Sequence, residues 1–131
     1  MPELHEKIQQ ADWKAEKHVP VIECPDSIAA GTPVEIKVSV GKEIAHPNTT
    51  EHHIRWITLA FQPDGGKFVY DVARFEFNVH GESTDGANKG PAYCEPVALV
   101  RAKFDRPGTL FALAYCNIHG LWESSKAIAI A

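Results

Sequence analysis

Strict alternation of apolar and polar side chains over residues 34–40 is the sequence feature that most constrains the fold. Val34, Ile36, Val38 and Val40 are apolar, and the three residues between them are glutamate, lysine and serine. Successive side chains of a β-strand point to opposite faces of its sheet. The segment is therefore predicted to be a strand with one face buried and the other in water.

Short apolar runs of similar character recur along the chain. They are rich in β-branched, aromatic and aliphatic residues and cover residues 19–22, 53–62, 67–79, 97–103, 109–116 and 126–130. The nine glycines and nine prolines are spread between these runs as turn signals. About seven short strands with such spacing predict an all-β fold, an antiparallel β-sandwich with immunoglobulin-like architecture. The only indication of a helix lies at residues 4–13.

The length of 131 residues, with 44% hydrophobic and 23% charged residues, fits one globular domain over residues 1–131. Residues 1–12 receive no role. The first 18 residues are polar and charged where a signal peptide needs an apolar core, and no later apolar run reaches membrane-spanning length. We therefore expect a cytoplasmic protein that does not bind membranes.

Charge and cysteine content exclude several classes of function. The net charge of -4 lacks the concentrated basic face that nucleic acids require, and it would repel an anionic substrate unless positive charge at the site overcame it. Cys24, Cys94 and Cys116 form no CxxC pair, so neither a disulfide framework nor a four-thiolate metal site is predicted.

The segment YCNIHGLW carries the first candidate metal ligands. Cys116 and His119 are three residues apart at the end of an apolar strand, where a turn can direct a thiolate and an imidazole to one point. The alternative is a buried cysteine beside an unrelated loop histidine, since free cysteines are often buried as small apolar residues.

Two other segments add candidates. In HPNTTEHH, a Pro-Asn turn signal separates His46 from His52 and could return both rings to one side, although a polar hairpin loop would have the same composition. In EKHVP, Glu16 and Lys17 precede His18 just before a strand. The alternative there is a solvated run of charges.

The remaining histidines and cysteines receive no role at a metal. His5 lies near the N-terminus, His80 precedes a glycine-containing loop, and His53 would point away from its neighbour if a strand has begun there. Cys24 and Cys94 are interpreted as packing or surface thiols.

Four imidazoles and one thiolate exceed the four ligands of structural zinc and favour a redox metal. If the imidazoles formed a plane with the thiolate on one axis, the opposite axis would be open to a small ligand.

The three segments EKHVP, HPNTTEHH and CNIHGLW resemble the motifs of superoxide reductases, also called neelaredoxins, and of the catalytic domain of desulfoferrodoxin. The resemblance extends from about Trp13 to the C-terminus. It implies one mononuclear non-haem iron with Glu16 as sixth ligand of the oxidised form and with Lys17 attracting superoxide to the reduced form. The other implied ligands are four equatorial histidines and one axial thiolate: His18, His46, His52, His119 and Cys116.

The resemblance also implies an activity and partners. Superoxide would be reduced to hydrogen peroxide with an electron from rubredoxin or a similar small donor, in a homotetramer with immunoglobulin-like sandwich subunits. The N-terminal four-cysteine iron domain of desulfoferrodoxin has no counterpart, so one metal centre is expected.

Two other classes of function remain open from the residues alone. A blue-copper electron carrier would use two histidines, a cysteine and a weak axial ligand, usually methionine, but the only methionine is Met1. An interaction module with an incidental metal would leave Glu16 and Lys17 as solvated surface residues.

Overall fold

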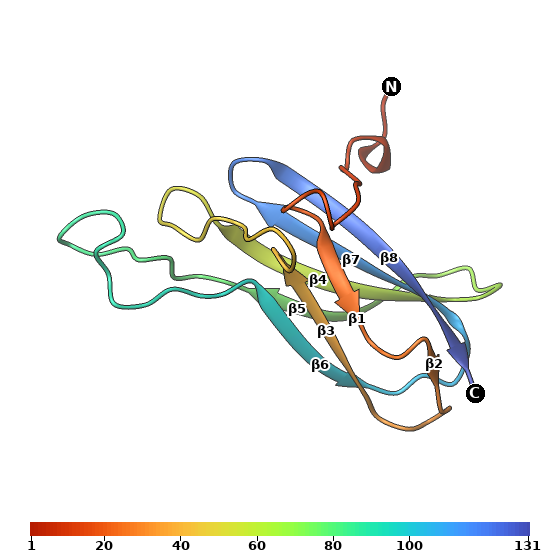
Figure 1. Ribbon diagram of the computed structural model, residues 1–131. Coiled ribbons are helices and arrows are strands. Elements are labelled where there is room, and N and C mark those ends of the chain that lie inside the picture. The colour runs from red at the N-terminus through yellow and green to blue at the C-terminus, as the bar shows by residue number, and fades with distance from the viewer.

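The computed structural model describes residues 1–131 and consists of two layers of β-strands (Figure 1). One 3-10 turn, η1 (Leu4–Glu6), precedes eight strands. The strands are β1 (Pro20–Glu23), β2 (Ser27–Ile28), β3 (Val34–Val40), β4 (Ile54–Pro63), β5 (Tyr70–Glu76), β6 (Val97–Ala102), β7 (Gly108–Cys116) and β8 (Gly120–Ile130).

The strands form a three-stranded sheet in the order β1-β3-β6 and a five-stranded sheet in the order β2-β8-β7-β4-β5. The predicted all-β sandwich is confirmed. One pair departs from the antiparallel arrangement, because the chain leaves β1 in one sheet and joins the other at β2, which runs parallel to β8 through Ser27 and Ile28. Strand β2 brings the number of strands to eight, where about seven were predicted.

Alternating side chains from the two sheets form the core between them. Leu110, Ala112 and Ala114 of β7 are buried at every second position and pack in one cluster with Ile36 and Val38 of β3. Cys116 continues the same inward-facing row at the last residue of β7. The alternation that burial imposes on β7 therefore directs the Cys116 thiol into the interior.

Two sequence predictions need correction. The helix indicated at residues 4–13 is absent apart from η1, because Gln9 pairs instead with the start of β8, donating its N–H to Leu121 O and accepting from Glu123 N–H. Strand β8 begins at Gly120 and not at residue 126, since backbone pairing with β7 extends through the whole hairpin. Polar side chains at residues 123–125, just before the predicted start, hid this first half of the strand from a hydrophobicity pattern.

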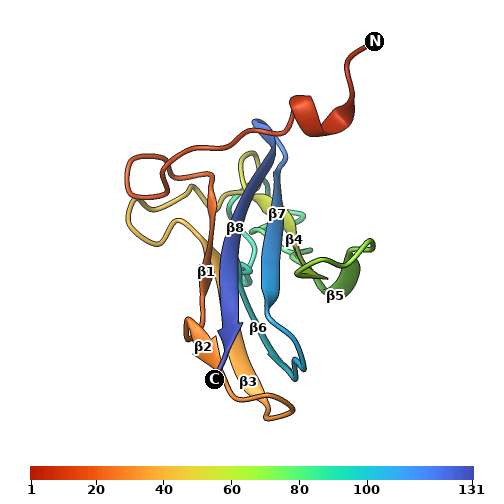
Figure 2. The ribbon, with the colours of Figure 1, turned by 90° about the vertical axis from the view of Figure 1, so that its right-hand side faces the viewer.

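The three segments that carry the candidate ligands meet at one end of the sandwich (Figures 1 and 2). They are the segment before β1, the long connection between β3 and β4, and the turn between β7 and β8. No helix in the structure has the length and hydropathy needed to cross a membrane.

Candidate metal centre

The turn between β7 and β8 holds Cys116 and His119 in fixed positions. Cys116 pairs with Gly120 across a three-residue turn, and Gly120 adopts a φ of 82°, the left-handed conformation that such hairpin turns require. The Cys116 side chain is fully buried, and its sulfur accepts a hydrogen bond from the backbone N–H of His119 at 3.4 Å. The His119 ring returns toward the same sulfur, with Nδ1 at 3.8 Å from Sγ.

His18 approaches this pair from the segment before β1. Its Nε2 atom lies 3.0 Å from His119 Nδ1, and its ring is buried. On the other side of the ring, Nδ1 lies 2.5 Å from a Glu16 carboxylate oxygen, which also accepts the backbone N–H of His18 at 3.0 Å. The hydrogen bond with the His18 side chain lowers the pKa of the Glu16 carboxyl. A charged carboxylate thus keeps a proton on Nδ1 and leaves the Nε2 lone pair directed at the cluster.

His52 and His46 complete a closed circle of four imidazole rings. His52 Nε2 lies 3.2 Å from His119 Nδ1. The His46 ring is next to those of His18 and His52, with centroid distances of 4.9 and 4.8 Å. One donor atom each from His18, His52, Cys116 and His119 lies within 4.8 Å of the other three.

His46 has a buried ring nitrogen without a hydrogen-bond partner. Its Nδ1 lies 2.6 Å from the Pro47 carbonyl oxygen, so Nδ1 must carry the proton and Nε2 the lone pair. Nε2 is buried and makes no hydrogen bond. Burial lowers the pKa of His46 to about 4, against the opposing effect of the Pro47 carbonyl, so the ring is neutral at pH 7 and ready to bind a metal without losing a proton.

The donor atoms fit a bound cation better than they fit one another. A single proton on His119 Nδ1 can satisfy one of its contacts with His18, His52 and Cys116, whereas a cation between these atoms would satisfy all of them. Two nitrogens that bind one ion at about 2.1 Å and at right angles lie about 3 Å apart. The observed separations of 3.0 and 3.2 Å match this spacing.

Lys17 and Glu16 occupy different places relative to the donor atoms. The Lys17 side chain is half-buried, and its positive charge is close enough to add to the burial that lowers the pKa of His46 and His52. The Glu16 carboxylate lies beside the ring nitrogen of His18 that faces away from the cluster. In this structure Glu16 therefore contacts His18 and is not among the converging donors.

Trp122 is a residue of the site that the sequence reasoning missed. Its ring stacks on that of His18 with a centroid distance of 4.9 Å, and its Nε1–H donates to the His119 carbonyl at 3.1 Å. Its place three residues after His119, in a strand that pairs with β7, is the signal that could have indicated it. Trp122 thus contacts the ring of His18 and the backbone of His119.

The other histidines lie outside the ring circle. His53 and His80 stack on each other, with a centroid distance of 3.5 Å and an interplanar angle of 5°, and both are buried. His5 is exposed near the N-terminus.

Comparison with known protein families shows to which family the chain belongs. The family model described as desulfoferrodoxin matches residues 10–125. The chain belongs to the desulfoferrodoxin family. Among its relatives are neelaredoxin of Megalodesulfovibrio gigas, 58% identical over 93% of this chain and 94% of that protein, and superoxide reductase of Pyrococcus furiosus, 56% identical over 95% and 98%.

Solved structures of the desulfoferrodoxin family give the same relationship. The reduced form of superoxide reductase (neelaredoxin) from Archaeoglobus fulgidus superposes with a TM-score of 0.87 at 57% identity, covering 93% of this chain and 98% of that one. These alignments cover nearly all of both chains, so all three segments with candidate ligands fall within a fold that the family shares.

Proposed function

We propose that this desulfoferrodoxin-family chain is a superoxide reductase with one iron per chain. The observation that carries the proposal is the convergence of imidazole nitrogens and a buried thiol on one point at the end of the sandwich. Relatives named superoxide reductase support it at more than half identity over nearly the whole chain. The proposed ligands are His18, His46, His52, His119 and Cys116.

Zinc is the alternative that the four closest donors allow, because three imidazoles and one thiolate can form a tetrahedral structural site. The unpartnered Nε2 atom of His46 indicates a fifth donor, whereas a structural zinc site takes four ligands. When bound, iron supplies the one-electron reduction of superoxide, and a thiolate ligand raises the electron density at such a metal. Superoxide, one electron and two protons together give hydrogen peroxide.

The chain's own residues attract the substrate and hold the donors in position. Against a net charge of -4, the Lys17 ammonium provides the local positive charge that draws a small anion toward the rings. Glu16 and Trp122 fix the orientation of His18 from two sides. A carboxylate on the remote nitrogen of a ligating histidine also makes the ring a stronger donor.

The electron must come from an external donor, because the reduction consumes one electron per superoxide. Rubredoxin or a similar small electron donor is the proposed partner. His119 and Ile118 form an exposed edge of the β7–β8 turn, with Ile118 60% exposed, which gives a donor a short path to the ring circle. A homotetramer, a cytoplasmic location and a single domain over residues 1–131 stay predictions.

Metal analysis of the purified protein tests the proposed centre. About one iron per chain is expected, with a visible colour that bleaches on reduction with ascorbate, because a thiolate bound to oxidised iron absorbs visible light. One copper per chain in protein from its natural source would favour an electron carrier. Zinc alone, or no metal, would contradict the proposal.

Substitution of Glu16 separates its two possible roles. Glu16→Gln keeps an acceptor for the His18 N–H but removes the carboxylate that the resemblance assigns to the oxidised iron. We expect a shifted visible band of the oxidised protein, while the reduced protein reacts with superoxide within about twofold of the wild-type rate because Lys17 remains. Visible absorption and pulse radiolysis give both quantities. An unchanged oxidised spectrum would show that Glu16 acts only through His18.

A further inference from the structure

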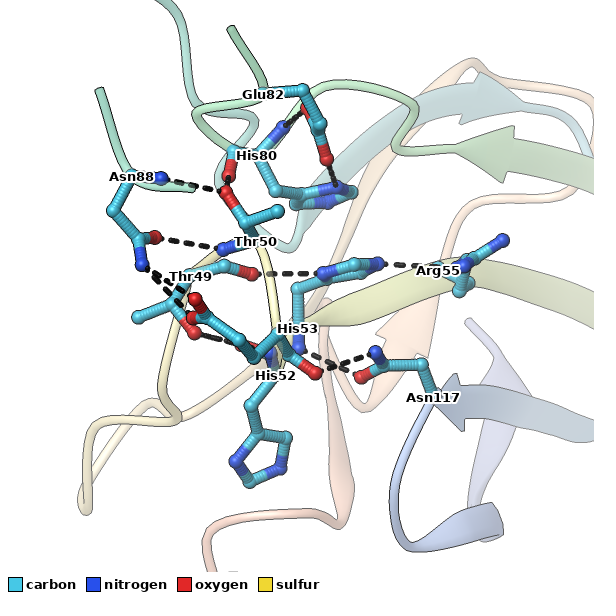
Figure 3. A network of polar contacts seen from close by, with 10 residues as sticks. Thr49, Thr50, His52, His53, Arg55, His80, Glu82, Asn88 and Asn117 are labelled. Atoms are coloured by element: carbon cyan, nitrogen blue, oxygen red, sulfur yellow. Dashed lines mark hydrogen bonds and ion pairs between the residues drawn. The ribbon is translucent and has the colours of Figure 1, made fainter. Parts of the chain in front are cut away.

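The side chain of Asn117 joins two segments that carry proposed ligands. Its Oδ1 atom accepts the backbone N–H of His53 at 2.9 Å, and its Nδ2 atom donates to the Glu51 carbonyl at 2.9 Å. Figure 3 shows the Asn117 amide facing the backbone beside His53, while the ring of His52 points away from the network. Both polar groups of the amide are thus hydrogen-bonded to the residues immediately before and after His52.

This position couples His52 to two proposed donors that are far from it in sequence. Asn117 follows Cys116 directly, and its backbone N–H also donates to the His53 carbonyl at 3.2 Å. Three hydrogen bonds therefore fix the backbone around His52 to the turn that bears Cys116 and His119. A hydrogen-bonded bridge of this kind can set the spacing between ring and thiol before any metal binds.

Other contacts hold the connection between β3 and β4, the loop that carries His52, but do not reach the β7–β8 turn. Thr50 donates its hydroxyl to the His80 carbonyl and its N–H to Asn88 Oδ1, and Asn88 donates to the Glu51 carboxylate. These bonds connect the loop to residues 80–88, on the opposite side of the network from Asn117 (Figure 3). Apart from the direct contact between the His52 and His119 rings, the hydrogen bonds between the loop and the turn all involve Asn117.

We propose that Asn117 is a positioning residue that preorganises His52 against Cys116 and His119 for metal binding. The inference rests on the metal centre of the proposed function, and it adds a residue that touches neither the metal nor superoxide. Loss of an outer partner of a metal ligand typically costs about 10- to 100-fold in metal affinity. Asn117 acts on three ligands at once, so its removal should fall in that range.

The test compares Co²⁺ binding by metal-free wild type, Asn117→Ala, Asn117→Asp and the matched control Asn78→Ala. Asn78 is an exposed asparagine whose side chain makes no hydrogen bond in the structure. We expect about 10- to 100-fold weaker Co²⁺ binding by Asn117→Ala. We also expect a shifted thiolate-to-cobalt band and faster hydrogen exchange of the His53 amide in the metal-free protein. Asn117→Asp keeps the acceptor for His53 N–H and should give intermediate affinity.

Equal Co²⁺ affinities and identical bands for wild type and both Asn117 variants would overturn the inference while leaving the proposed function intact. Failure of wild type to bind Co²⁺ would overturn the proposed centre and this inference together. A general loss of stability is distinguished by thermal unfolding of the metal-free proteins and by the band position, which changes with the surroundings of the metal and not with the stability of the fold. If Asn117→Ala does not fold, Asn117→Asp provides the same comparison.

Discussion

Replacement of Cys116 by serine is expected to abolish the visible thiolate-to-iron band and the reaction with superoxide. Cys116 is the only buried cysteine, and its sulfur lies beside His119 with a backbone N–H directed at it. Serine retains the shape but not the soft, electron-donating sulfur. Loss of an outer partner costs about 10- to 100-fold, so loss of a ligand itself should exceed 100-fold in activity.

Visible absorption of the oxidised protein and pulse radiolysis of the reduced protein measure these effects. Cys94→Ser is the matched control, because Cys94 is a free, half-buried thiol that is not among the converging donors. It should keep the band and the wild-type rate. A Cys116→Ser protein that retains the band would contradict the assignment of this thiolate as a ligand.

Removal of the Lys17 charge is expected to give the second largest effect. Lys17→Ala should slow the reaction of reduced protein with superoxide by about tenfold at low ionic strength, since a local cation raises the encounter rate of an anion. The salt dependence of the rate should also become flatter, because salt screens the attraction that the variant has lost. Rates measured by pulse radiolysis over a range of salt concentrations give both values.

Lys14→Ala provides the control for overall charge. Lys14 is exposed and lies over the Trp13 ring. Its replacement by alanine changes the net charge of the protein by the same amount as Lys17→Ala. Its rate should stay close to that of wild type. Equal rates for Lys17→Ala and wild type at low salt would contradict a role for Lys17 in attracting superoxide, provided that both proteins contain the same amount of iron.

Local patterns predicted the sandwich well because burial between two sheets imposes a period of two on the sequence. The alternation at residues 34–40 became β3, and the apolar run over residues 109–116 became most of β7. The same pattern could not predict β2, which has two residues, or the first half of β8, where residues 123–125 are polar. Both of these form through pairing with a neighbouring strand, which is a tertiary property.

The candidate site was predicted to a similar extent. Three motifs predicted the side chains that the structure brings together, although the binding of iron by these side chains stays a prediction. Sequence spacing could not show that Glu16 contacts the remote nitrogen of His18, or that Trp122 stacks on the same ring. Nor could it identify Asn117, whose two partners are about 65 residues away in the chain and meet it only after β4 and β7 have paired.

The most direct test of the proposed activity is the yield of hydrogen peroxide per superoxide consumed. Iron-loaded protein is reduced, separated from the reductant and mixed with superoxide in less than one equivalent. We predict one hydrogen peroxide for each superoxide, no release of dioxygen, and oxidation of one iron for each superoxide. One hydrogen peroxide for every two superoxide molecules, with dioxygen released, would show dismutation and would contradict the assignment as a reductase.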